Sequence, residues 1–153
     1  MSRGDKAKEL FLEGYNCSQA VVCAFTDLTG LDISTSAKAA SSFGGGLARL
    51  REVCGTVSGA AMVLGLIKGY DDVKDPSKKA EHYRFIRSFA ETFARDNGSI
   101  ICRELLKGVK TTPGGDPEPR TGEFYKRRPC PELVKYAADL VEKMLEDTGE
   151  EPV

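Results

Sequence analysis

The chain has 153 residues, a formal net charge of −1 and 41% hydrophobic residues, which predicts one globular domain with a hydrophobic core. The balanced charge leaves no broad basic surface of the kind that nucleic-acid-binding proteins use. The N-terminus is charged from its first residues, unlike a secretory signal, and the longest apolar run, 60–67, is too short to span a bilayer. We therefore expect a cytoplasmic protein with no nucleic-acid partner and no membrane insertion.

Hydrophobic residues recur with a helical period through the first part of the chain. A first apolar helix face ends before Gly14. Asn16, followed three residues later by Gln19, forms a capping-box pattern and predicts a helix over about 17–29. A short alanine-rich helix follows and ends near the glycines at 44–46. We expect these glycines to form a turn that orients Cys54.

The segment 54–69 predicts a helix that carries glycine at positions 55, 59, 65 and 69. Glycine weakens an exposed helix by roughly 1 kcal/mol relative to alanine. That cost is acceptable where small residues let neighbouring backbones approach closely. We therefore predict that this helix is among the most buried elements. The alternative is that one of its faces makes room for a bound group beside Cys54.

The second half of the chain is predicted to be helical as well. Asp75 and Pro76 suit the N-cap and first position of a long helix that runs to about 96. Helices are also predicted over about 100–107 and 131–147, and the Pro- and Gly-rich segment 108–128 is expected to form a long loop. No run alternates with the period of a strand. The sequence therefore predicts an all-α, single-domain bundle of about five to seven helices.

Five cysteines are present, and no two form a C-x-x-C pair, so any shared site must be assembled by the fold. Four of them lie at or near predicted helix starts: Cys17, Cys54, Cys102 and Cys130. Unpaired N–H groups and the helix dipole stabilise a thiolate there, which predicts lowered thiol pKa values. Three of these cysteines also have a basic neighbour: Arg51 near Cys54, Arg103 beside Cys102, and Arg128 near Cys130.

Cys23 does not fit this pattern. It is predicted to lie within the 17–29 helix, about 120° around the helix axis from the stripe that carries Cys17. Two cysteines so placed cannot easily share one site. We interpret Cys23 as a structural residue.

The residues around the four cysteines resemble a family of redox-active proteins named for the pattern C…GCAxxG…C…C, with a central CGAxxG motif. The motif corresponds to the segment 54–59, CGTVSG, with Thr56 in place of alanine, preceded by FGGG and followed by VLGL. The other family cysteines correspond to those in YNCSQAV, CRELL and RPCPELV. The resemblance covers roughly 5–145 and implies redox activity, without specifying a reaction.

Three functions remain open. Cys17, Cys54, Cys102 and Cys130 could perform thiol/disulfide exchange or electron transfer with a redox partner protein, as in a thiol/disulfide oxidoreductase, with Cys54 favoured as the attacking thiol. The same four could instead bind a metal, either zinc or an iron–sulfur cluster. Finally, the chain could be a non-catalytic helical binding module whose cysteines only fill the core. The four cysteines are expected to converge if either of the first two functions holds.

Overall fold

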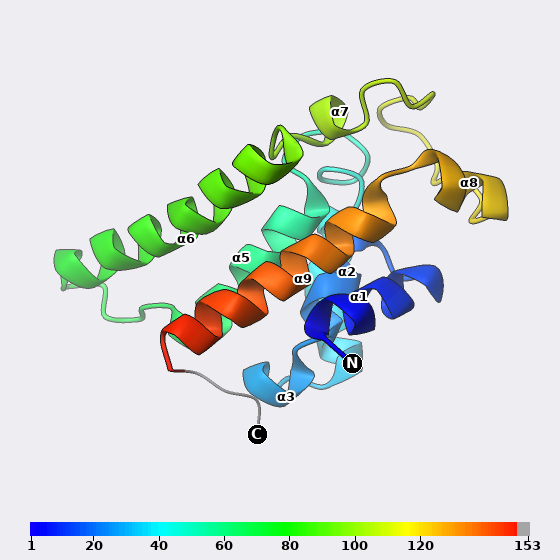
Figure 1. The fold of residues 1–153 in the computed structure, drawn as a ribbon. Coiled ribbons are helices and arrows are strands. Elements are labelled where there is room, and N and C mark those ends of the chain that lie inside the picture. The colour runs from blue at the N-terminus through cyan, green and yellow to red at the C-terminus, as the bar shows by residue number, and fades with distance from the viewer. Residues whose placement is uncertain (150–153) are drawn as a thin grey trace.

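The computed structural model describes residues 1–149 and confirms the predicted all-α, single-domain fold (Figure 1). Nine α-helices and one short 3-10 helix form within these residues, more than the five to seven that the sequence predicts. In chain order they are α1 (Arg3–Leu12), α2 (Cys17–Cys23), α3 (Thr26–Thr29), α4 (Ile33–Ala40), η1 (Ser41–Phe43), α5 (Gly55–Lys68), α6 (Pro76–Asn97), α7 (Cys102–Leu105), α8 (Gly122–Arg127) and α9 (Cys130–Asp147).

The single helix predicted over 17–29 is divided into α2 and α3. Phe25, whose φ and ψ are −123° and 22°, interrupts the helix and places its ring fully in the core. Arg3 stabilises this break, since its guanidinium donates a 2.8 Å hydrogen bond to the Ala24 carbonyl and lies 5.0 Å from the centre of the Phe25 ring. The break depends on a contact with α1, which the local sequence does not reveal.

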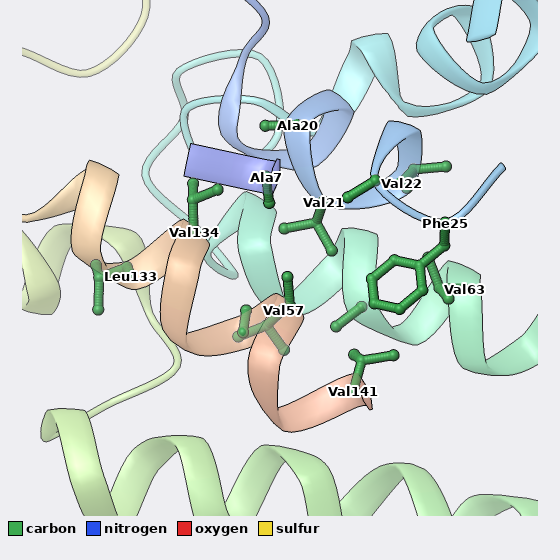
Figure 2. Packing of buried hydrophobic residues seen from close by; sticks show 14 of the residues in the cluster. Ala7, Ala20, Val21, Val22, Phe25, Val57, Val63, Leu133, Val134 and Val141 are labelled. Atoms are coloured by element: carbon green, nitrogen blue, oxygen red, sulfur yellow. The ribbon is translucent and has the colours of Figure 1, made fainter. Parts of the chain in front are cut away.

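The glycine-rich helix α5 is enclosed by its neighbours, as predicted. It packs against α2, α9 and α6, and most of its first ten residues are buried. Figure 2 shows Val57 and Val63 of α5 among valines from α2 and α9. The most extensive contact between helices is that of α1 with α9, and α2 also packs against α4. The core therefore lies between α1, α2, α5 and α9.

The segment between α6 and α9 covers one end of this bundle (Figure 1). It contains α7, an irregular stretch over 108–121, and α8, which occupies the last part of the predicted 108–128 loop. The long helix α6 begins after Asp75, whose carboxylate caps it as expected. Among residues 1–149, no helix is both long enough and apolar enough to cross a bilayer.

Candidate functional site

The four cysteines singled out in the sequence all lie at helix starts. Cys17, Cys102 and Cys130 are the first residues of α2, α7 and α9, and Cys54 is the N-cap residue of α5. All four line one cavity of about 360 Å³. The fold thus brings together residues that lie up to 113 positions apart in the sequence, from 17 to 130. Cys54 and Cys102 are largely buried, whereas Cys17 and Cys130 retain partial exposure.

Cys23 lies outside this cavity. It is the last residue of α2 rather than a mid-helix residue, because the helix ends before Ala24. Its side chain is 3% exposed, and the sulfur lies 3.7 Å from the Ile33 carbonyl oxygen. This environment agrees with the structural role that the sequence suggests for Cys23.

Backbone pairing links Cys54 and Cys102. The Cys54 N–H donates to the Ile100 carbonyl at 2.7 Å, and the Cys102 N–H donates to the Glu52 carbonyl at 2.6 Å. Between them, Val53 and Ile101 form a single antiparallel bridge. A pairing of one residue on each side leaves no period-2 signal, so the sequence could not predict it. It fixes the starts of α5 and α7 beside each other.

The turn at 44–46 holds Cys17 and Cys102 rather than Cys54, contrary to our expectation. The backbone N–H of Gly45 lowers the pKa of the Cys17 thiol. Gly46 lies so close to Cys102 that a Cβ atom at Gly46 would be 2.7 Å from the Cβ atom of that cysteine. Both glycines have positive φ, 70° and 73°, which side-chain-bearing residues rarely adopt.

This left-handed conformation continues beyond the glycines. The φ values of Leu47, Ala48 and Arg49 are 68°, 48° and 67°, and that of Arg51 is 62°. A non-glycine residue in this region costs roughly 1–2 kcal/mol. The conformation is held by backbone bonds within the loop, including Arg51 N–H to the Gly45 carbonyl at 3.1 Å. The strained loop forms one wall of the cavity and places Arg49 and Arg51 in it.

The thiols of Cys17, Cys54 and Cys130 have raised pKa values, which corrects the prediction of lowered values for these three cysteines. Burial raises the pKa of Cys17 and Cys54, and raises that of Cys130 to about 12. The nearby cysteines oppose ionisation further, since a charge on Cys17 raises the pKa of both Cys54 and Cys130. Desolvation therefore outweighs the favourable helix-start environment.

Three kinds of contact partly offset the effect of burial on the thiol pKa values. Backbone N–H groups of Gly45 and Ser18, together with the charge of Arg120, lower the pKa of Cys17. Arg128 lowers the pKa of Cys130 through its charge and a hydrogen bond. These groups stabilise a thiolate once it forms, without making it the resting state.

Thr56, the residue that departs from the family motif, contacts the Cys54 sulfur. Its Oγ1 lies 3.1 Å from that sulfur, and its side chain is fully buried. The hydrogen bond lowers the pKa of Cys54, against the larger effect of burial. The sequence shows a threonine in place of the motif's alanine at this position but does not reveal its contact with the cysteine.

The arginines do not all contact the cysteines that their sequence positions indicate. The Nη1 of Arg51 lies 3.9 Å from the sulfur of Cys102, not beside Cys54. Arg103 pairs with Glu52 at 2.8 Å, and both side chains are more than half exposed. Instead, the cavity wall carries Arg49, Arg51, Arg120 and Arg128. Sequence analysis missed Arg49 and Arg120, which come from the strained loop and the segment before α8.

The arrangement does not fit a metal site. Across residues 1–149, no three His, Cys, Asp or Glu side chains lie close enough together to hold a metal ion. A structural zinc site requires four ligands around one centre. The four sulfurs line the same cavity without forming such a set, so the zinc and iron–sulfur alternatives receive no support from their geometry.

Comparison with known proteins agrees with the family resemblance. A profile of the family described as "Putative redox-active protein (C_GCAxxG_C_C)" matches residues 15–144, a span that contains all four cavity cysteines. No curated protein and no solved structure gives a significant match. Because the match covers most of the sequence and includes the cavity cysteines, the chain belongs to the C_GCAxxG_C_C protein family.

Proposed function

We propose that the chain is a thiol/disulfide redox protein whose chemistry takes place in the cavity lined by Cys17, Cys54, Cys102 and Cys130. The observation that carries this proposal is that four cysteines from four separate helix starts line one cavity. The redox-active description of the family is consistent with it. Reversible thiol chemistry also suits the reducing cytoplasm, where the sequence suggests that the protein acts.

Cys17 is the best candidate for the attacking thiol. As a residue it is partly exposed, whereas Cys54, the residue favoured by sequence reasoning, is 6% exposed; the Cys17 thiol itself is buried in the cavity wall. Cys17 interacts electrostatically with Cys54, Cys102 and Cys130, as Cys130 does with its three neighbours, so Cys17 lies near every other cysteine of the group. Backbone N–H groups directed at this sulfur stabilise the thiolate that must form for attack.

Cys54 is the best candidate for the second thiol of the pair. The Cys17 sulfur contacts Gly55, the residue next to Cys54. In the proposed exchange, the Cys17 thiolate attacks one sulfur of an external disulfide and releases the first thiol, which takes up the proton lost by Cys17. Cys54 then attacks the Cys17 sulfur of the mixed disulfide and releases the second thiol, which takes up the proton lost by Cys54. One external disulfide is reduced to two thiols, and two protein thiols are oxidised to one disulfide.

The test is to mix anaerobically reduced protein with a small disulfide and count the thiols lost and released. We expect two protein thiols to be consumed per disulfide, and peptide mapping to find Cys17 joined to Cys54. Cys17→Ala should abolish this product. Cys23→Ala serves as the matched control and should leave stoichiometry and rate unchanged, because Cys23 lies outside the cavity. Absence of exchange would favour the non-catalytic binding module, whereas normal exchange in Cys17→Ala would show that another cysteine is the attacking thiol.

A further inference from the structure

We infer that the cavity selects small disulfides that carry negative charge, such as disulfides with a carboxylate a few bonds from sulfur. This inference rests on the proposed function and specifies its substrate class. Four arginines line the cavity: Arg49, Arg51, Arg120 and Arg128. Among the described residues that line it, Glu118 is the only acidic one. The cavity wall therefore carries excess positive charge.

The one carboxylate is already neutralised. Glu118 accepts a 2.7 Å hydrogen bond from Arg128, and its other oxygen lies 3.6 Å from Arg127, which is not in the cavity lining. Burial raises the pKa of Glu118, but the charge of Arg128 and the hydrogen bond from it, with smaller contributions from other groups, outweigh that effect. The pKa of Glu118 is therefore lowered. If Glu118 offsets Arg128, then Arg49, Arg51 and Arg120 still have no carboxylate opposite them among the residues that line the cavity.

Two of the arginines also present a buried donor with no partner. The Nε atoms of Arg51 and Arg128 have no hydrogen-bond acceptor among the described residues, although Arg51 is only 5% exposed and the Arg128 side chain 7%. Leaving a buried donor unsatisfied costs roughly 1–3 kcal/mol, more for a charged group. Both side chains line the cavity, so a carboxylate bound there lies beside two guanidinium groups whose hydrogen-bonding capacity is not fully used. The N-termini of α5 and α9 also open onto the cavity and favour an anion.

The rest of the wall suits the body of such a molecule. Phe11, Phe124 and Leu133 form an apolar part of the lining, against which short methylene chains can pack. Arg120 lies over the rings of Phe11 and Phe124, at 4.3 and 5.0 Å, and its Nη atoms donate to backbone carbonyls. Because its Nη atoms are already hydrogen bonded, Arg120 attracts an anion in the cavity mainly through its charge. A volume of about 360 Å³ lies at the small end of ligand pockets and suits a compact molecule.

The test compares three disulfides with the same two-carbon arms and different end groups. These are 3,3′-dithiodipropionate, a dianion; bis(2-hydroxyethyl) disulfide, which is neutral; and cystamine, a dication. The rate of protein thiol loss is measured with each and divided by its rate with a free small thiol, which corrects for intrinsic reactivity. We expect the normalised rate to be at least about tenfold higher for the dianion than for the neutral compound, as one charge-assisted hydrogen bond allows, and lowest for the dication.

Variants then assign the preference to the cavity. Arg51→Gln should lower the dianion-to-neutral rate ratio by about tenfold, and Arg51→Lys should restore part of it. Arg49→Gln should lower the ratio in the same direction; because Arg49 is only half-buried, this variant keeps the test valid if Arg51→Gln does not fold. Arg103→Gln is the matched control, since Arg103 points to Glu52 outside the cavity, and should leave the ratio unchanged.

The outcomes separate this inference from the function on which it rests. Equal normalised rates for all three disulfides, or a ratio that no cavity arginine alters, would overturn the anion preference and leave thiol/disulfide exchange standing. If none of the three disulfides oxidises the protein, the proposed function itself fails, and the inference fails with it.

Discussion

The Cys17 sulfur lies against Gly55, so close that a Cβ atom on Gly55 would clash with it. The same Cβ atom would also lie 2.8 Å from the Phe43 carbonyl oxygen, and one turn later a Cβ atom on Gly59 would lie 2.8 Å from the Ser18 carbonyl oxygen. These glycines let the start of α2 lie directly against α5. The sequence presented close packing and room for a bound group beside Cys54 as alternatives; at Gly55 the glycine serves close packing and makes room for the Cys17 sulfur.

Gly55→Ala should therefore destabilise the fold, by roughly 1–3 kcal/mol, because the new methyl group meets backbone atoms as well as a sulfur. Gly65→Ala is the matched control in the same helix. A Cβ atom there has no neighbour within 4 Å, so the substitution should stabilise the protein by up to about 1 kcal/mol. Urea denaturation measures both changes. Equal effects of the two substitutions would contradict the close approach of α2 and α5.

Structural features formed by neighbouring residues could be predicted from the sequence, whereas features formed between distant segments could not. The capping box of Asn16 and Gln19 is formed within four residues, and the structure contains it. The contact between Gly55 and Cys17 and the bridge between Val53 and Ile101 join distant segments and leave no local pattern. The pKa values of the thiols likewise depend on one local feature and one feature of the whole fold. A helix start is visible in the sequence, whereas the burial that reverses its effect depends on the whole fold.

The hydrogen bond between Thr56 and Cys54 predicts a change in thiol reactivity. Thr56→Val keeps the buried shape but removes the hydroxyl, so the pKa of Cys54 should rise further and its alkylation should begin about one pH unit higher. Thr56→Ser retains a hydroxyl and should react like the original protein. The measurement is iodoacetamide labelling of Cys54 against pH, followed by mass spectrometry. Identical profiles in all three proteins would show that the hydroxyl does not influence Cys54.

The raised pKa of Cys130 predicts a loss of stability in alkali. The thiol titrates at about 9 in the unfolded chain and at about 12 in the folded protein. Above pH 9 the unfolded state therefore releases a proton that the folded state retains. The stabilisation is complete below pH 9 and is lost progressively as the pH rises towards 12. At pH 10 the expected loss is about 1.4 kcal/mol.

A comparison with Cys130→Ala isolates this contribution from other groups that titrate in alkali. The free energy of unfolding should fall more steeply between pH 7.5 and pH 10 in the original protein than in the variant, by about the amount given above. Both proteins are measured by urea denaturation under reducing conditions. Parallel curves would show that the Cys130 thiol is not buried in the neutral form.

The strained loop beside the cavity provides the last prediction. Ala48 is exposed and has a φ of 48°, in the middle of consecutive left-handed residues. Glycine adopts this conformation without the clash that costs an alanine roughly 1–2 kcal/mol, although it also gains entropy in the unfolded state. Ala48→Gly should therefore stabilise the protein by roughly 0.5–1 kcal/mol.

The same substitution in a helix should have the opposite effect. Ala39, exposed in α4, is the matched control, and Ala39→Gly should cost about 1 kcal/mol. Strain of this kind persists only where surrounding contacts fix the chain, and this loop holds Arg49 and Arg51 in the cavity wall. A stabilised Ala48→Gly protein would show that the strain is real in solution. A loss equal to that of Ala39→Gly would instead mean that residue 48 does not occupy the left-handed conformation.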